Sequence, residues 1–98
     1  MIDWSNFNFN QVLSMTILDE NIKYDLKVKL VEYEYSLHRH PLIADVQILE
    51  STNVEIYPLE SVMRLPIETK DSVNFLLYAP TDKAPARELQ RKGLITLN

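Results

Sequence analysis

Hydrophobic and polar residues alternate along much of this chain, which is the pattern of β-strands that bury one face in a core. Over residues 7–18 the odd positions are mostly apolar, whereas the even positions are mostly Asn, Ser and Thr. This period of two predicts a half-buried antiparallel strand. A helix beginning at Ser5 is the alternative, but the alternation and the density of Asn favour the strand. Asp19, Glu20 and Asn21 then supply turn chemistry.

The next segment, residues 22–37, alternates more clearly and predicts the second strand of a long β-hairpin over residues 7–37. At Leu30 and Val31 two apolar residues adjoin and the phase slips by one, which indicates a β-bulge or bend, or else a break into two strands. A straight strand of this length would span about 50 Å at ~3.3 Å per residue. That exceeds the roughly 32 Å diameter of a domain of this size. We therefore expect the hairpin either to bend at Leu30 and Val31 or to project as an arm.

The remaining chain divides into shorter elements separated by prolines and polar turns. Further strands are expected over residues 42–50, 54–57, 73–78 and 94–97. Residues 58–66 suit a short helix or a strand about equally well, because Pro58 and Pro66 could start and stop a helix while Leu59, Met63 and Leu65 fit either period.

A short helix is expected over residues 81–93. Asp82 is a plausible cap, Pro85 fits the first turn, and Gly93 suits the left-handed position that ends a helix. The expected fold class is therefore α+β and β-dominated. It is a mostly antiparallel sheet of five to six strands with a long N-terminal β-hairpin and a short C-terminal helix.

The composition is that of a single globular domain over residues 1–98. Of the 98 residues, 46% are hydrophobic and 24% are charged, with a net charge of −4. No apolar run approaches the roughly 18 residues of a membrane span, and the start of the chain has no signal-peptide pattern, so we expect a cytoplasmic protein. The absence of Cys excludes disulfides and thiolate chemistry. With Gly93 as the only glycine, glycine-rich phosphate-binding loops are excluded too, and no cofactor is expected.

His38 and His40 are the only histidines, and in an extended strand both could point toward one metal ion. A third ligand would have to come from Asp45 or Glu34. The arginine between the histidines and the proline after them favour an exposed corner between strands instead. The serines and carboxylate pairs fall into no catalytic arrangement, so we expect no enzymatic activity.

Charge is segregated along the chain. Residues 41–62 carry acidic but no basic residues. Possible nucleic-acid contacts are the basic residues of the expected C-terminal helix, Lys83, Arg87, Arg91 and Lys92. A second basic row on one strand face consists of Lys23, Lys27 and Lys29. Neighbouring acidic residues dilute that row, and lysine on a strand is also a usual protection of a sheet edge.

Aromatic residues gather in the first third of the chain and are candidate interface residues, because aromatic side chains anchor interfaces. They are Trp4, Phe7, Phe9, Tyr24, Tyr33 and Tyr35. We expect a non-enzymatic assembly subunit that docks into a larger oligomer or particle by strand-edge pairing and aromatic burial. A virus-particle component, such as a head, connector or tail protein, is one analogy. The alternative is a small regulatory or inhibitory binder of a protein or nucleic acid, and a metal-dependent enzyme using His38 and His40 is a third possibility.

Overall fold

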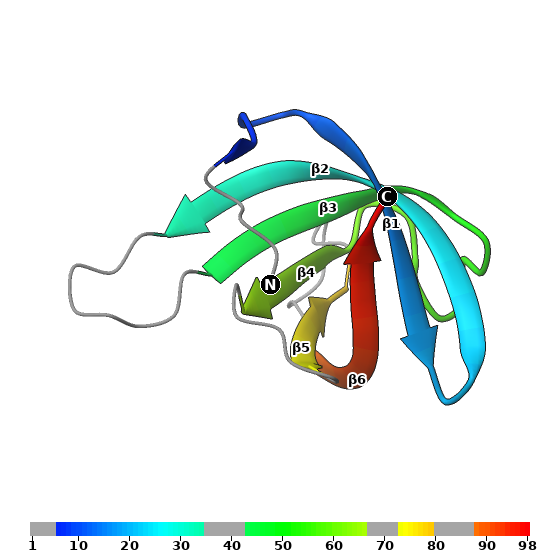
Figure 1. Ribbon diagram of the computed structural model, residues 1–98. Helices are drawn as coiled ribbons and strands as arrows, with labels where there is room; N and C mark the ends of the chain where they lie inside the picture. The colour runs from blue at the N-terminus through cyan, green and yellow to red at the C-terminus, as the bar shows by residue number, and fades with distance from the viewer. Residues whose placement is uncertain (1–5, 35–42, 67–72, 80–87) are drawn as a thin grey trace.

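The structure is a computed structural model that describes residues 6–34, 43–66, 73–79 and 88–98. It contains six strands: β1 (Val12–Asp19), β2 (Ile22–Glu34), β3 (Ile43–Ser51), β4 (Val62–Pro66), β5 (Val73–Tyr78) and β6 (Glu88–Leu97). Each strand pairs antiparallel with the next, and β6 pairs antiparallel with β1, so the sheet closes into a barrel (Figure 1). An even number of strands allows this closure, because the first and last strands of such a meander then run in opposite directions.

The expected α+β class and the expected C-terminal helix over residues 81–93 are wrong. Glu88–Gly93 form the first half of β6 and pair with β5 without a register shift, while residues 81–87 lie outside the described residues. The alternation of residues across β6 and its pairing with β5 override the helix signals, as tertiary context commonly does. The described residues contain no α-helix.

Gly93 has a different role from the expected helix-end position. It does not adopt a positive φ. Instead, a Cβ at this position would lie 3.1 Å from Ile17 Cγ2 and 3.1 Å from the Leu18 carbonyl oxygen. The absence of a side chain therefore allows β6 to approach β1 closely where the barrel closes.

The predicted N-terminal hairpin is present, although its first strand begins at Val12 rather than at Phe7. Glu20 and Asn21 connect the strands as a two-residue loop, with φ values of 50° and 65°. Positive φ at both positions is the requirement of the type I′ turn that matches the twist of a hairpin. Both strands lie in the barrel wall, since β1 also pairs with β6 and β2 also pairs with β3.

Two β-bulges bend the β2–β3 pair. The register shifts twice, leaving Leu49 as the extra residue on β3 and Val31 as the extra residue on β2. The second shift confirms the predicted bulge at Leu30 and Val31. β2 has 13 residues, about 43 Å if straight at ~3.3 Å per residue, whereas the longest dimension of the molecule is 36 Å. Bulges bend a strand and increase its twist, so β2 curves with the wall.

The barrel interior is filled by the apolar residues of the alternating pattern. The buried hydrophobic residues are Met15, Ile17, Tyr24, Leu26, Val28, Leu30, Ala44, Val46, Ile48, Tyr57, Met63, Leu65, Val73, Phe75, Leu77 and Ile95. All but Tyr57 lie on strands. Val12, Ser14, Thr16 and Leu18 of β1 alternate with these and lie on the outer face.

The connection between β3 and β4 corrects one further prediction. Residues 54–57, expected as a strand, form a turn. Asn53 organises it, because its Oδ1 accepts hydrogen bonds from the backbone N–H groups of Glu55 at 3.1 Å and Ile56 at 3.2 Å. Its carbonyl accepts from the Tyr57 N–H at 2.9 Å. Of the two alternatives for residues 58–66, the strand is present from Val62 onward.

Candidate interaction surface

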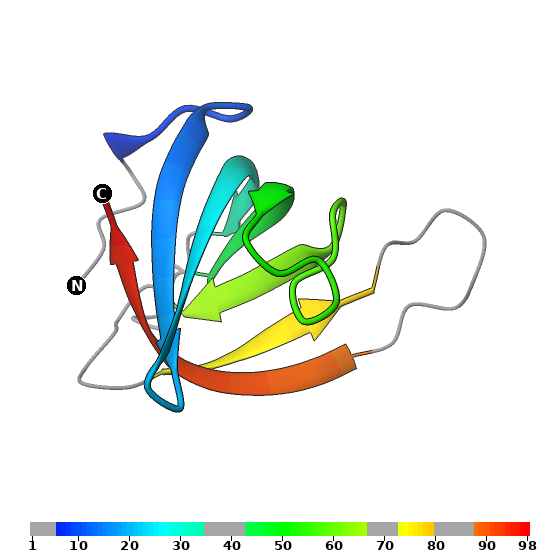
Figure 2. The ribbon, with the colours of Figure 1, turned by 90° about the vertical axis from the view of Figure 1, so that its right-hand side faces the viewer.

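Tyr57 plugs one end of the barrel. The turn before it carries the side chain from the β3–β4 connection into the interior, where it is 0% exposed. Its ring lies edge-on to Tyr24, with centroids 4.9 Å apart, and is stacked with Phe75 at 6.5 Å. Such aromatic pairs add stabilisation beyond their buried area. Figure 2 looks toward this end, with the connection crossing the opening between the strands.

The polar tip of Tyr57 is held by the β1–β2 hairpin. Its hydroxyl donates a hydrogen bond to Asp19 Oδ2 at 3.5 Å. Burial raises the pKa of the Tyr57 phenol well above its ordinary value, the Asp19 carboxylate raises it further, and the nearby Arg91 guanidinium opposes the rise. Tyr57 is therefore kept neutral and acts as a hydrogen-bond donor, not as a base.

Two pockets adjoin beside this plugged end, where β6 separates from the β1–β2 turn. Their volumes are about 410 Å³ and 360 Å³, and Asp19, Glu20 and Lys92 line both. We call the two together the hairpin–β6 cleft. The first is also lined by Leu18, Asn21, Gly93 and Leu94, and the second by Ile22, Tyr24, Ile56, Gln90 and Arg91. Opposite charges thus line a cleft that has apolar side chains at its rim.

Large apolar side chains are exposed around this cleft. Leu18 and Leu94 are register partners across the β1–β6 seam, on its outer face, and are 41% and 40% exposed. Ile22 at the start of β2 is also exposed, but it continues the inward alternation of Tyr24 and lines only the second pocket. Grouped exposed apolar residues with a polar surround mark interaction surfaces in many proteins.

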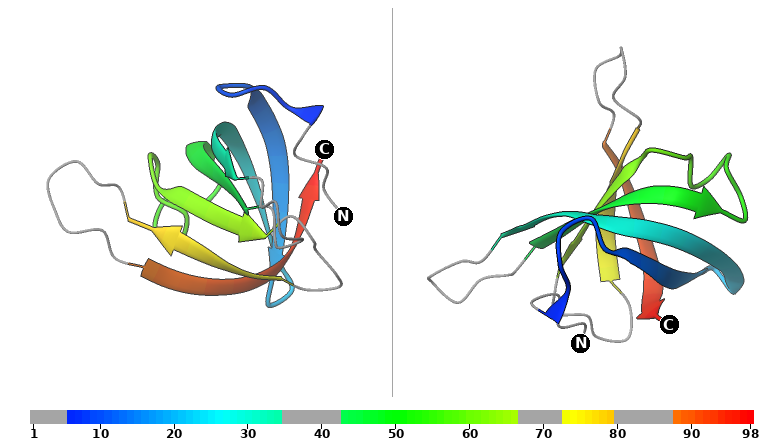
Figure 3. Two further views of the ribbon diagram at one scale, coloured as in Figure 1. Left: turned by 90° about the vertical axis from the view of Figure 1, so that its left-hand side faces the viewer. Right: turned by 90° about the horizontal axis from the view of Figure 1, so that it is seen from above.

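The first half of β6 is also an edge of the sheet. β1 pairs with β6 only over Leu94–Leu97, whereas β5 pairs with Glu88–Gly93. Within the described part of the chain, no strand pairs with the β1-facing side of Glu88–Gly93. Figures 2 and 3 show this half of β6, coloured orange, with β5 along one side and no described strand along the other.

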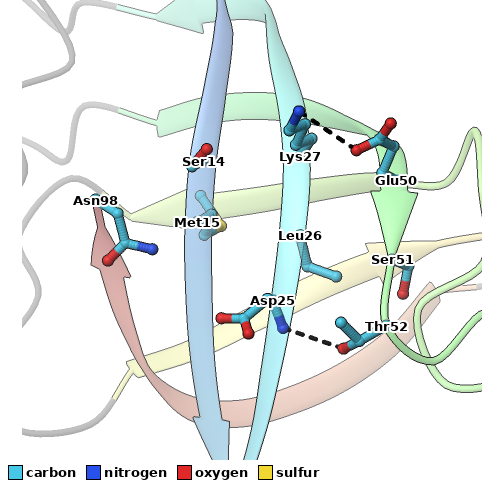
Figure 4. Close-up of a pocket in the computed structure, with 9 residues that line it drawn as sticks. All are labelled: Ser14, Met15, Asp25, Leu26, Lys27, Glu50, Ser51, Thr52 and Asn98. Atoms are coloured by element: carbon cyan, nitrogen blue, oxygen red, sulfur yellow. Dashed lines mark hydrogen bonds and ion pairs between the residues drawn. The ribbon is translucent and has the colours of Figure 1, made fainter.

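A pocket of about 550 Å³ lies on the outer face of β1, β2 and β3 (Figure 4). Several of its polar groups already form hydrogen bonds. Thr16 Oγ1 donates to Asp25 Oδ1 at 2.9 Å, Asn98 Nδ2 donates to Thr16 Oγ1 at 2.8 Å, and the Asp25 N–H donates to Thr52 Oγ1 at 3.1 Å. This network holds Asn98 against β1 and the start of the β3–β4 connection against β2, so we assign it a structural role.

The predicted aromatic interface residues lie in different environments. Phe9 is 58% exposed and lies outside the barrel, while Phe7 is half-buried and packs against the core. Tyr24 is buried against Tyr57 and lines the second pocket of the hairpin–β6 cleft. Trp4, Tyr35 and the side chain of Tyr33 lie outside the described residues.

The predicted basic contacts are not brought onto one face in the described chain. Arg91 and Lys92 are adjacent on a strand, and therefore point to opposite sides of the sheet. Lys27 of the second basic row forms an ion pair with Glu50 at 3.6 Å. Lys83 and Arg87 lie outside the described residues.

His38 and His40 also lie outside the described residues, as does the side chain of Glu34. Asp45, the other suggested metal ligand, instead binds Arg64 through two hydrogen bonds of 3.0 and 3.1 Å across the β3–β4 pair. Among the residues that the structure describes, no group of three His, Asp or Glu could hold a metal ion.

Sequence reasoning missed the apolar rim of the cleft. One signal was present, because Leu18 interrupts the Asn, Ser and Thr of the polar face of the first strand. Its proximity to Leu94 depends on closure of the barrel, which the pattern of a single strand does not reveal.

Among the described residues, no helix is long and apolar enough to cross a membrane. No protein-family model, curated protein or solved structure matches this chain.

Proposed function

We propose that this protein is a non-enzymatic assembly subunit that binds other copies of itself through the outside of its barrel. The observation that carries this proposal is the exposed apolar pair Leu18 and Leu94 at the hairpin–β6 cleft, beside an open strand edge. Removing apolar surface from water stabilises an association by about 25 cal/mol per Å². An edge adds backbone hydrogen bonds, which give such contacts their direction.

A second exposed apolar group at the other end of the hairpin supports the same proposal. Phe9, Val12 and Val31 are all exposed. Backbone hydrogen bonds from Asn10 N–H to the Leu30 carbonyl at 2.8 Å, and from Leu30 N–H to the Gln11 carbonyl at 3.2 Å, hold the chain before β1 beside the Val31 bulge. Exposed apolar residues at both ends would let one subunit contact more than one neighbour.

Light scattering coupled to size-exclusion chromatography tests the proposal. The mass measured for the eluting protein should be a multiple of the 11.5 kDa of one subunit, and this mass should fall on dilution. Replacing both rim leucines, Leu18→Ser with Leu94→Ser, should weaken association. Glu55→Ser, at an exposed position of the β3–β4 connection, is the matched control. A compact monomer at every concentration would exclude the proposed function.

A further inference from the structure

We infer that two copies of this chain join through the first half of β6, with the two β6 strands antiparallel across a two-fold axis at Gln90. The inference rests on the proposed function and identifies its partner and contact surface. It would extend the two barrel walls into one continuous sheet through β5 and β6 of each copy.

The hydrogen-bond phase of β6 determines which backbone groups face the open edge. The Asn98 N–H donates to the Ser14 carbonyl at 3.0 Å, so Asn98 turns its backbone groups toward β1. In an antiparallel ladder every second residue does so, and neither the β1 nor the β5 pairing of β6 contains a register shift. Counting back in steps of two, Lys92, Gln90 and Glu88 direct their N–H and C=O groups toward the open edge.

With the backbone groups directed in this way, only one two-fold register lets all three of these residues form hydrogen bonds with the second copy. An axis at Gln90 pairs Gln90 with itself and Glu88 with Lys92 of the second copy, giving six backbone hydrogen bonds in the pattern of an antiparallel ladder. An axis at Arg91 would place Glu88 opposite Leu94, which already pairs with β1. An axis at Leu89 would place Lys92 opposite residue 86, beyond the start of β6.

Charge complementarity favours a second copy as the occupant. In the register centred on Gln90, an acidic residue lies opposite a basic residue at both ends of the paired segment. Opposite charges directly across a strand pair are stabilising, and like charges are destabilising. Lys92 on an isolated edge would oppose unwanted pairing, whereas in this register its backbone position lies opposite that of Glu88.

The β1–β2 turn lies beside one end of this edge, since Asp19, Glu20 and Lys92 line both pockets of the hairpin–β6 cleft. Leu94, where β1 begins to pair with β6, lies two residues beyond the proposed segment. The exposed rim leucines Leu18 and Leu94 lie at the same end of the barrel. The second strand would therefore lie next to the apolar surface of the hairpin–β6 cleft.

Proline substitution tests the edge. The Gln90 N–H faces away from β5, so Gln90→Pro removes no hydrogen bond between the described strands and fits an edge position. It deletes both central hydrogen bonds of the proposed pair. We expect Gln90→Pro to reduce the mass in light scattering to that of a monomer, while Gln90→Thr, which keeps the N–H, leaves the mass unchanged. Circular dichroism checks that both variants are folded.

Charge exchange tests the register without proline. Lys92→Glu places two acidic residues opposite each other at both ends and should raise the dissociation constant about tenfold, whereas Glu88→Lys with Lys92→Glu should restore association. Because the chain has no Cys, Gln90→Cys should form a disulfide-linked dimer on mild oxidation, and Thr96→Cys, at a position paired with Thr16, should not.

The outcomes separate this inference from the proposed function. An oligomer whose mass is unchanged in folded Gln90→Pro overturns the inference and leaves the proposed function standing. Failure of the double charge exchange to restore association overturns the register. A wild-type protein that is monomeric throughout overturns both, and an extended segment of a different protein would then be the occupant to seek.

Discussion

Tyr57 and Asp19 join two connections that are far apart in the sequence, through a hydrogen bond of 3.5 Å from the phenol to the carboxylate. The bond ties the β3–β4 connection to the β1–β2 turn at the plugged end of the barrel. The aromatic ring of Tyr57 fills the interior beside Tyr24 and Phe75. We therefore expect Tyr57 to contribute much of the stability of this end.

Truncation of Tyr57 should be strongly destabilising. Tyr57→Ala removes a fully buried aromatic ring, and such changes cost about 3–5 kcal/mol in the free energy of unfolding. Urea denaturation followed by circular dichroism measures the change. Leu59→Ala, at an exposed position of the same connection, is the control and should change stability by less than about 0.5 kcal/mol. Equal losses of unfolding free energy for the two substitutions would contradict a stabilising role for the buried Tyr57 ring.

Alkaline pH should destabilise the protein through the same phenol. Because burial raises the pKa of Tyr57 in the folded state above its value in the unfolded chain, the unfolded state releases this proton first. The contribution of neutral Tyr57 is thus complete below pH ~10, the ordinary tyrosine pKa, and is lost as pH rises above it. Melting temperature measured across this range should fall less steeply for Tyr57→Phe than for wild type. Parallel curves would show that another group controls the alkaline response.

Much of the wall could be predicted from alternation alone. The Leu30–Val31 phase slip located a bulge, and the four residues Tyr24, Leu26, Val28 and Leu30 follow the predicted inward face of β2. Gly93 shows why the C-terminal half could not be predicted. Its helix-end signal is local, whereas its actual role depends on the approach of Ile17 from the other end of the chain.

The same limit applies to the interaction surface. The exposed edge of β6 exists because β1 begins to pair only at Leu94, and the register of barrel closure is not encoded in any one strand. Tyr57 was expected in a strand, but the Asn53 side chain stabilises a turn there. Asx turns of this kind compete with strand pairing through local hydrogen bonds.

Substitution at Gly93 should disturb the seam between β1 and β6. Gly93→Ala would place a Cβ within 3.1 Å of both Ile17 Cγ2 and the Leu18 carbonyl oxygen. Overpacking of this kind costs roughly 1–3 kcal/mol, and thermal denaturation should reveal it. Thr96→Ala, at an exposed position of the same strand, serves as the comparison. A Gly93→Ala protein as stable as wild type would mean that the strands separate there without cost.

Substitution of Ser61, unlike that of Gly93, should not lower the stability of the protein. It is fully buried, and no hydrogen-bond partner for its Oγ is found among the described residues. An unpaired buried hydroxyl costs about 1–3 kcal/mol, so Ser61→Ala should leave the free energy of unfolding unchanged or raise it. Chemical denaturation decides the sign. A clear loss of stability would show that the hydroxyl has a partner.

Amide hydrogen exchange along β6, followed by nuclear magnetic resonance at low and high protein concentration, tests self-association through this edge most directly. The N–H groups of Leu89 and Arg91 face β5 and should be protected at every concentration. Those of Gln90 and Lys92 face the open edge and should exchange rapidly in dilute protein, then become protected as the protein associates. Association with Gln90 and Lys92 still exchanging rapidly would contradict pairing through β6.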